Sequence, residues 1–348
     1  MTPGSNFSAE GAENEGKRCV VNDQMEPFIV IYILIFIISL CGSLMSVWTF
    51  IHSPRDKRSG SVYLMNLLAA DLLLLLALPF KILKDLRVAS WSLMVFHCQA
   101  SAVTIYISLY ASIVFLALII TNCYLQDCDG VCALRLQEVG FARLLSVVVW
   151  LLLLLIMVPN MALPIQEVKV SQYLSCSSLK KDLGLHWHAL TVFLCTALFL
   201  NALAAVLISS GLSLKRLLGS RGNPGLWADA RRVAVSVTVA LAAYMLSFVP
   251  YHAVRTPYTL AQTKVISDCQ TKRRLFLGKE STLMLALVHV CLHPLVYYYL
   301  HPPFRRTAQR LMTWRRGEEK DGGGAGGGGP GGEAPTQVEN HEEERFNP

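Results

Sequence analysis

Seven long apolar segments, separated by shorter polar ones, constrain this chain more than any other feature of its sequence. A bilayer core about 30 Å thick is crossed by about 20 apolar residues in an α-helix, which matches the length of these segments. They cover approximately residues 28–50, 61–80, 96–126, 144–165, 187–214, 233–258 and 276–300. The pattern predicts an all-α membrane protein with a seven-transmembrane helix bundle.

The composition points the same way. Of the 348 residues, 53% are hydrophobic and only 16% are charged, whereas about a quarter of a typical soluble domain is charged. The formal net charge is +7, and residues 318–348 carry eight acidic and two basic side chains, so that segment carries −6 and the rest +13. The basic residues lie in short segments between the apolar ones and form no continuous stripe, which argues against nucleic acid as a partner.

Basic residues do not decide which side of the membrane each loop occupies. With the N-terminus outside, 15 Lys and Arg side chains lie near the inner face and 14 lie on the outer side. The positive-inside rule therefore hardly distinguishes the two orientations of the chain. The tripeptide Asn6-Phe7-Ser8 is a glycosylation sequon with Asn6 as acceptor, which favours an outside N-terminus. The first twenty residues show no basic region followed by an apolar one, so we expect the first helix to act as a signal anchor.

The polar ends divide the chain further. We expect residues 1–27 to form an extracellular N-terminal segment and residues 28–301 to form the bundle. Residues 302–316 begin with prolines and carry several arginines, which is typical of a short amphipathic eighth helix on the inner membrane surface. Residues 317–348 hold a glycine tract and an acidic cluster, so we expect a disordered cytoplasmic tail.

Four of the ten cysteines lie in the polar segments on the side of the sequon, namely Cys19, Cys98, Cys176 and Cys269. An oxidising outer face permits two disulfides among them. Cys128 and Cys132 form a spaced pair without further His or Cys nearby, so we expect neither a metal site nor a cofactor.

Several short motifs follow one another along the spans. They are Asn66-Leu67-Leu68-Ala69-Ala70-Asp71-Leu72, Trp91 with Phe96-His97-Cys98, Trp150 with Pro159, Phe248-Val249-Pro250-Tyr251-His252, and Pro294-Leu295-Val296-Tyr297. Together, at these spacings, they resemble the rhodopsin-like (class A) G-protein-coupled receptors over roughly residues 25–315. The run from Phe248 to Thr263 and the motif Lys279-Glu280-Ser281-Thr282-Leu283 are similar to the purinoceptor-like cluster of that family.

The resemblance implies a multi-pass receptor in the plasma membrane with its N-terminus outside. Its partners would be an extracellular ligand, a heterotrimeric G protein of the inhibitory class and, as a further candidate, arrestin. It also implies that Cys98 pairs with Cys176, which would tie the third helix to the second outer loop. Cys19 would pair with Cys269.

Cationic side chains gather at the predicted outer ends of helices two, six and seven. Ionisable residues in or beside a membrane span are costly and indicate function, and in the resembling receptors the matching positions line a pocket for nucleotides, acidic lipids or peptide carboxylates. The residues expected at this ligand site are Tyr106, His252, Arg255, Tyr258, Gln262, Lys279, Lys81 and Lys84. The sequence predicts an anionic small molecule or peptide as ligand. In the alternative, these side chains only extend to the lipid headgroups.

The predicted inner ends of the helices depart from the resembling family. Where an acidic residue and Arg are usual at the end of the third helix, this chain has Asn122 and Cys123. The residues expected to take part in signalling are Asn122, Cys123, Tyr124, Asp71, Phe248, Pro250, His293, Pro294 and Tyr297. We expect G-protein coupling to survive this departure. The alternative is an atypical, non-coupling or scavenging receptor.

Asp71 and Ser112 remain from the sodium site that the resemblance implies, but His293 stands before Pro294 where Asn or Asp is usual. His289 and His293 are four residues apart, so both imidazoles can point at Asp71. Alternatively, both only form hydrogen bonds within the bundle.

Two other classes of membrane protein fit the sequence poorly. An intramembrane enzyme would need a catalytic cluster, and the chain contains neither an HExxH nor a GxSxG motif. A transporter or channel is a remote alternative, because the sequence shows no internal repeat at a fixed period.

Overall fold

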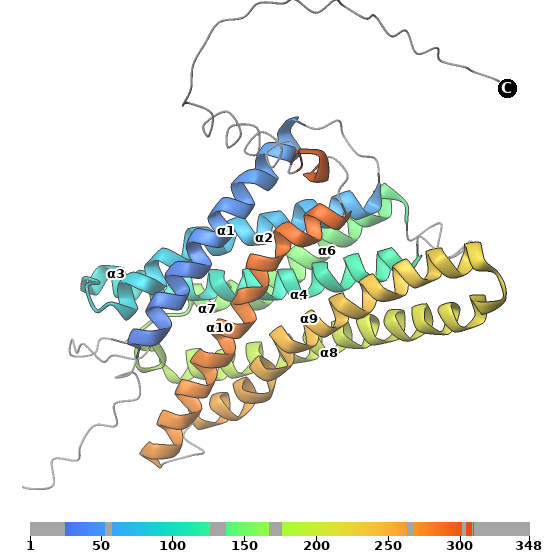
Figure 1. The fold of residues 1–348 in the computed structure, drawn as a ribbon. Coiled ribbons are helices and arrows are strands. Elements are labelled where there is room, and N and C mark those ends of the chain that lie inside the picture. The colour runs from blue at the N-terminus through green and yellow to red at the C-terminus, as the bar shows by residue number, and fades with distance from the viewer. Residues whose placement is uncertain are drawn as a thin grey trace, which may run out of the picture. The chain divides into compact units, whose positions relative to one another are not determined.

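The computed structural model describes residues 25–52, 58–125, 137–166, 176–262, 268–300, 304–307 and 309. Within these ranges it contains seven helical spans long and apolar enough to cross a membrane, which confirms the predicted bundle (Figure 1). The spans are α1 (Glu26–His52), α2 (Ser59–Asp85), α3 (Trp91–Phe96) with the π-helical turn η1 (His97–Ser101) and α4 (Ala102–Leu125), α6 (Val139–Met157) with α7 (Pro159–Ala162), α8 (Asp182–Gly219), α9 (Pro224–Gln262) and α10 (Cys269–Leu300).

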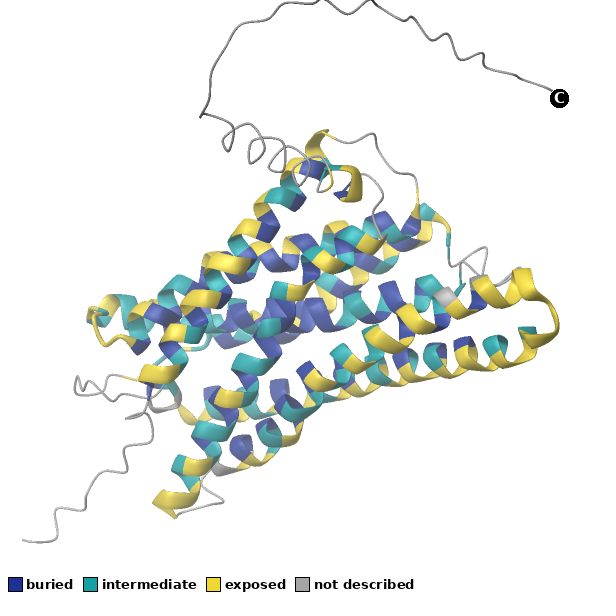
Figure 2. Ribbon diagram, viewed as in Figure 1, coloured by how far each residue is buried: buried dark blue, intermediate teal, exposed yellow. Residues whose placement is uncertain are grey.

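The third span forms the centre of the compact unit Met1–Arg305. Its helix α4 packs against α2, α6, α8 and α9. In the most apolar stretch of this span 78% of the residues are buried, against 22% in α1. Figure 2 shows the difference as a mainly dark blue α4 and a strongly yellow outer face of α1. The third span is therefore the element against which the others are positioned.

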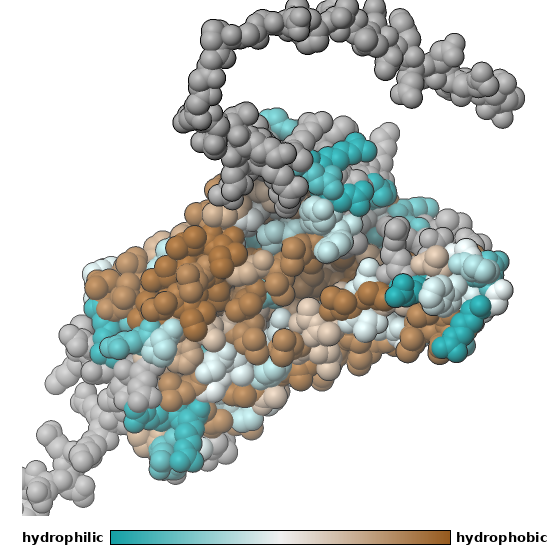
Figure 3. Space-filling model, viewed as in Figure 1, coloured by the Kyte–Doolittle hydropathy of each residue, from teal (hydrophilic) through white to brown (hydrophobic). Residues whose placement is uncertain are grey.

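The outer face of the bundle is apolar. Figure 3 shows a broad brown surface over the helices. Large exposed hydrophobic side chains on it include Val30, Leu34, Ile51, Leu76, Leu151, Leu155, Leu200 and Ile208. Water-soluble proteins rarely expose apolar surface of this extent. The surface is instead suited to lipid, since a transmembrane helix satisfies its own backbone hydrogen bonds.

Two helices extend well beyond the predicted spans. We predicted spans over residues 187–214 and 233–258, whereas α8 and α9 cover 182–219 and 224–262 and are joined by the 3-10 turn η3 (Ser220–Gly222). Hydropathy detects only the part of a helix that meets lipid, and the polar extensions contain good helix formers such as Leu, Arg and Lys. The side chain of Asn223 begins α9 by accepting hydrogen bonds from the backbone of Gly225 and Leu226, at 3.2 and 3.4 Å.

Small and hydroxyl-bearing residues set the close contacts between helices. Gly42 of α1 faces the ring of Pro294 in α10, where an added Cβ atom would overlap the ring. The Ser108 hydroxyl of α4 donates to the carbonyl of Ala70 in α2 at 2.7 Å. These contacts bring α1, α2, α4 and α10 together near the middle of the bundle.

Several predictions concern residues outside the described ranges. The sequon at Asn6, the cysteine Cys19 and the tail over residues 317–348 belong to this group. Of the predicted eighth helix, residues 304–307 are helical. The ring of Phe304 packs against that of Tyr297, with centroids 5.9 Å apart. The predicted limits of the N-terminal segment, the eighth helix and the tail therefore remain predictions.

Candidate functional site

A cavity of about 140 Å³ lies at the end of the bundle where α2, the third span, α8, α9 and α10 meet. Its lining is rich in cationic and aromatic side chains. These are Lys81, Lys84, Lys180, Arg255, Lys279, His97, His188, Tyr106, Tyr110, Tyr251, Tyr258 and Phe276, together with the single carboxylate Glu280.

Six of the eight predicted ligand-site residues line this cavity, namely Lys81, Lys84, Tyr106, Arg255, Tyr258 and Lys279. The lining does not include His252. Its ring stacks on Phe199 with centroids 3.8 Å apart, and its Nδ1 bonds the carbonyl of Phe248 at 2.9 Å. His252, a residue of α9, thus packs against α8 and α4. The side chain of Gln262 lies outside the described residues.

Two carboxylates face the lysines of the site. Glu280 accepts hydrogen bonds from Lys81 at 3.1 Å, from the hydroxyl of Tyr32 at 3.0 Å, and from Lys279. Asp85 accepts from Lys81 at 2.9 Å and from Lys84 at 3.0 Å. Each of these three lysines therefore has a carboxylate partner within the protein.

Arg255 has a different environment. It is 4% exposed, and its Nη2 donates to Nε2 of His188 at 3.1 Å. Its guanidinium lies 5.1 Å from the ring centroid of Tyr106 and 5.8 Å from that of Tyr258. Among the described residues no carboxylate forms an ion pair with it. Arg255 therefore presents a buried positive charge without an anionic partner in the part of the chain that the structure describes.

Lys180 is a second cation without a carboxylate partner among the described residues, and it is half-buried. It follows the short 3-10 helix η2 (Cys176–Leu179), and its Nζ donates to the side-chain oxygen of Asn160 at 3.2 Å. Burial, together with the positive charge of Arg255, lowers the pKa of Lys180 from 10.5 to about 8. Our reading of the sequence missed Lys180 and His188. The available signal for Lys180 was its position four residues after a cysteine of the predicted disulfide.

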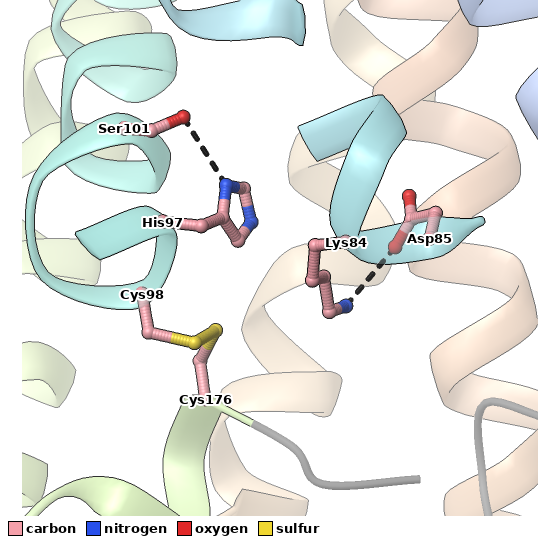
Figure 4. The surroundings of a disulfide bond; sticks show 6 residues. All are labelled: Lys84, Asp85, His97, Cys98, Ser101 and Cys176. Carbon is pink, nitrogen blue, oxygen red and sulfur yellow. Dashed lines mark hydrogen bonds and ion pairs between the residues drawn. A yellow bond between two sulfur atoms is a disulfide. The ribbon is translucent and has the colours of Figure 1, made fainter. Parts of the chain in front are cut away.

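The predicted disulfide between Cys98 and Cys176 is present, with the two Cα atoms 5.2 Å apart. Figure 4 shows it at the end of the third span, with Lys84 and Asp85 of α2 nearby. Cys98 lies in η1, where Nδ1 of His97 lies 3.1 Å from the Ser101 hydroxyl. The bond therefore attaches the segment that carries Lys180 to the third span. Cys269 is also disulfide-bonded, and its predicted partner Cys19 lies outside the described residues.

The part of the chain that contains the seven apolar spans matches one family of known proteins. Residues 42–297 match the model of the 7 transmembrane receptor (rhodopsin family). This chain belongs to the rhodopsin family of seven-transmembrane receptors. The receptor is 46% identical to G-protein coupled receptor 171 of Mus musculus over 292 residues, which are 84% of this chain and 91% of that protein.

Purinoceptors are similar to the receptor at a lower level. Purinoceptor 13 of Rattus norvegicus is 35% identical over 305 residues, which are 87% of this chain and 90% of that protein. Purinoceptor 14 of Bos taurus is 36% identical over 290 residues, 83% and 85% of the two chains. These similarities confirm the predicted family and its purinoceptor-like cluster. The receptor is therefore a multi-pass plasma-membrane protein with an extracellular ligand and a G protein as partners, and it is not an enzyme.

At the other end of the bundle, neutral hydrogen bonds hold the third span. Asn122 is buried and accepts from the Ser59 hydroxyl of α2 at 3.0 Å. The hydroxyl of Ser209 in α8 lies 3.2 Å from that of Thr121. Cys123 carries a free thiol and is half-buried, and Tyr124 follows it in the last turn of α4. No cation stands at position 123 to take the place of the family's Arg.

The middle of the bundle holds a polar cluster around Asp71. Nδ1 of His293 lies 2.7 and 2.9 Å from the two carboxylate oxygens, and the Tyr297 hydroxyl donates to one of them at 3.1 Å. His289 instead bonds the carbonyl of Ala286 through Nδ1. The sequence left two alternatives for these histidines. His293 points at Asp71, whereas His289 forms a hydrogen bond elsewhere within the bundle. The ring of Phe248 in α9 packs against His289, with centroids 4.8 Å apart, and Pro250 lies in the same helix.

Proposed function

We propose that this receptor senses an anionic small molecule, or a peptide with an acidic group, and signals through heterotrimeric G proteins of the inhibitory class. One observation carries the ligand proposal: Arg255 is buried in the cavity wall without a carboxylate partner among the described residues. A buried, uncompensated charge is strongly unfavourable. An anion entering the cavity would supply the missing partner.

The charges of the cavity favour an anion as a whole. Five basic side chains line it, and only Glu280 in the lining and Asp85 beside it oppose them within the described residues. These two carboxylates bind Lys81, Lys84 and Lys279 and offset two of those three charges, whereas Arg255 and Lys180 have no carboxylate partner among the described residues. Charge complementarity of this kind both steers an anion to a site and fixes its orientation.

The division of charges also indicates where the anion would bind. A guanidinium binds a carboxylate or phosphate through two parallel hydrogen bonds. Arg255 would take this role, with Lys180, which lies between η2 and α8 and lines the same cavity, as a second donor. The rings of Tyr106 and Tyr258 flank the guanidinium and would pack against an apolar or aromatic part of the ligand. Lys279 would contribute less, because Glu280 already binds it.

A binding screen tests the ligand proposal. The purified receptor would be heated in the presence of nucleotides, acidic lipids and acidic peptides, because a ligand that binds only the folded state raises the melting temperature. We expect an anion to stabilise the wild type and to lose this effect in Arg255→Gln. Arg274→Gln is the matched control, since Arg274 is exposed at the start of α10. Equal stabilisation of the wild type and Arg255→Gln would refute the role of Arg255.

Inhibitory-class coupling is supported by the resemblance to the purinoceptor-like cluster. The half-exposed Cys123 favours the second candidate, a non-coupling or scavenging receptor, because no Arg is present to reach the G protein. The two candidates differ in basal and ligand-induced dissociation of an inhibitory G protein in cells. A signal from the wild type supports coupling. A signal only from Asn122→Asp/Cys123→Arg, or from neither protein, supports scavenging.

A further inference from the structure

The carboxylate of Asp71 is buried in the middle of α2, with 1% of the residue exposed. An ionised carboxylate in such a place is strongly destabilising unless hydrogen-bond donors or a cation surround it. Within the described ranges its hydrogen-bond partners come from α10. They are Nδ1 of His293, at 2.7 and 2.9 Å from the two oxygens, and the hydroxyl of Tyr297 at 3.1 Å.

The direction of these hydrogen bonds follows from the groups involved. When Asp71 is ionised its carboxylate only accepts hydrogen bonds, and Nδ1 of His293 then carries the hydrogen that points at Asp71. The Tyr297 hydroxyl also donates. Both oxygens of Asp71 thus face an N–H group, and one of them also faces an O–H group.

This arrangement does not fit the sodium ion that the rhodopsin-family bundle implies between Asp71 and Ser112. Hard cations such as sodium are held by several oxygen lone pairs. The Ser112 hydroxyl is buried, has no partner within the described residues, and lies one turn from Ser108, which bonds Ala70. That oxygen could serve a cation. His293 opposes it, because it places an N–H group in front of the carboxylate.

The imidazole of His293 is fixed in this position by its neighbours. Only 1% of the surface of His293 is exposed. The ring of His289 packs against it edge to face at a centroid distance of 4.9 Å and an interplanar angle of 71°, and Tyr297 flanks it at 6.3 Å. Rotation of His293 away from Asp71 would require these rings to move, so the space beside the carboxylate stays filled.

We propose that His293 takes the place of the sodium ion as the partner of Asp71, so that the junction between α2 and α10 is held by the chain itself and does not respond to sodium. The ligand proposed above plays no part in this inference. The residue before Pro294 would thus have a defined function in this receptor. The imidazole N–H group of His293 replaces an exchangeable sodium ion beside Asp71.

The test compares melting temperatures of the purified, full-length receptor in sodium chloride and in choline chloride at equal ionic strength. For the wild type we expect equal values in both salts. His293→Asn removes the ring and offers an amide oxygen beside Asp71, so we expect its melting temperature to be higher in sodium by roughly 3 °C or more. Adding Asp71→Asn to that variant should abolish the difference.

Two results would overturn the proposal. The first is a wild type that melts at a higher temperature in sodium, with the difference lost in Asp71→Asn, because sodium would then bind despite His293. The second is a folded His293→Asn variant with no sodium dependence, because His293 would then not be what excludes the ion. If His293→Asn does not fold, His293→Gln serves the same purpose, and the wild-type comparison needs no variant.

Discussion

The ammonium of Lys81 in α2 lies 3.1 Å from the carboxylate of Glu280 in α10, and both side chains are at most 7% exposed. The two residues are 199 positions apart in the sequence. Glu280 also binds Tyr32 of α1, so one carboxylate joins three helices at the cavity. The ion pair therefore has two roles, because it connects the helices and occupies cations that a ligand could otherwise use.

Loss of Glu280 alone should destabilise the receptor more than loss of both members of this pair. Glu280→Gln leaves Lys81 and Lys279 buried without that charge, and such a change lowers the free energy of unfolding by about 3–5 kcal/mol. In Lys81→Met/Glu280→Gln, part of this loss should be recovered, because one of the lysine charges that Glu280 offset is gone. Thermal unfolding of the two single variants and the double variant measures the coupling. Strictly additive losses would contradict a direct interaction.

The affinity for an anionic ligand should depend on pH through Lys180. Because burial lowers the pKa of Lys180 to about 8, its ammonium is charged below pH 8 and is lost as the pH rises above that value. An anion prefers the charged form, so its affinity should be constant at lower pH and fall above pH 8. If the contact contributes about 1.4 kcal/mol, the fall by pH 9.5 approaches tenfold.

Binding titrations between pH 6 and 9.5 would measure this dependence. Lys180→Arg is the control, because a guanidinium keeps its charge over the whole range. Its affinity should stay flat, and any residual change would report on the ligand's own titration. The same decline in wild type and Lys180→Arg would show that Lys180 is not the titrating group.

The sequence predicted the fold well because hydropathy is a local property. Each span needs only its own apolar residues to be recognised, and all seven were found. The ends of α8 and α9 were missed, because the polar extensions leave the membrane while they remain helical. The predicted ends of these two helices were therefore wrong, because hydropathy marks where a helix leaves the lipid and not where its backbone stops being helical.

The candidate site could be predicted only in part, for a related reason. The cations Arg255 and Lys279 were predicted from their charge, their place at the outer helix ends and their motifs. Of these two, the structure pairs only Lys279 with a carboxylate among the described residues. Which lysine meets which carboxylate depends on contacts between α2 and α10, far apart in the chain. Lys180 was not predicted, because it lies outside the apolar spans. The disulfide between Cys98 and Cys176 brings its segment to the cavity.

The disulfide between Cys98 and Cys176 should support both stability and the cavity. It closes a loop with a sequence separation of 78 residues, and removing a native disulfide typically lowers stability by about 2–5 kcal/mol. In Cys98→Ser/Cys176→Ser we expect a lower melting temperature and weaker anion binding, because the segment with Lys180 is no longer attached to the third span. Cys41→Ser, which changes a free and exposed cysteine, should affect neither. Unchanged anion affinity in the double variant would separate the disulfide from the binding site.

The contact between Gly42 and Pro294 should make α1 intolerant of any side chain at this position. A Cβ atom on Gly42 would overlap the ring of Pro294, and both lie in helices that would have to separate to relieve the overlap. We expect Gly42→Ala to lower the free energy of unfolding by about 1–3 kcal/mol, as in other overpacked cores, despite the better helix propensity of alanine. Gly211→Ala is the matched control, because a Cβ atom at this position in α8 meets nothing within 4 Å. It should leave the melting temperature unchanged or raise it. A Gly42→Ala variant as stable as Gly211→Ala would show that α1 and α10 do not approach this closely in the membrane.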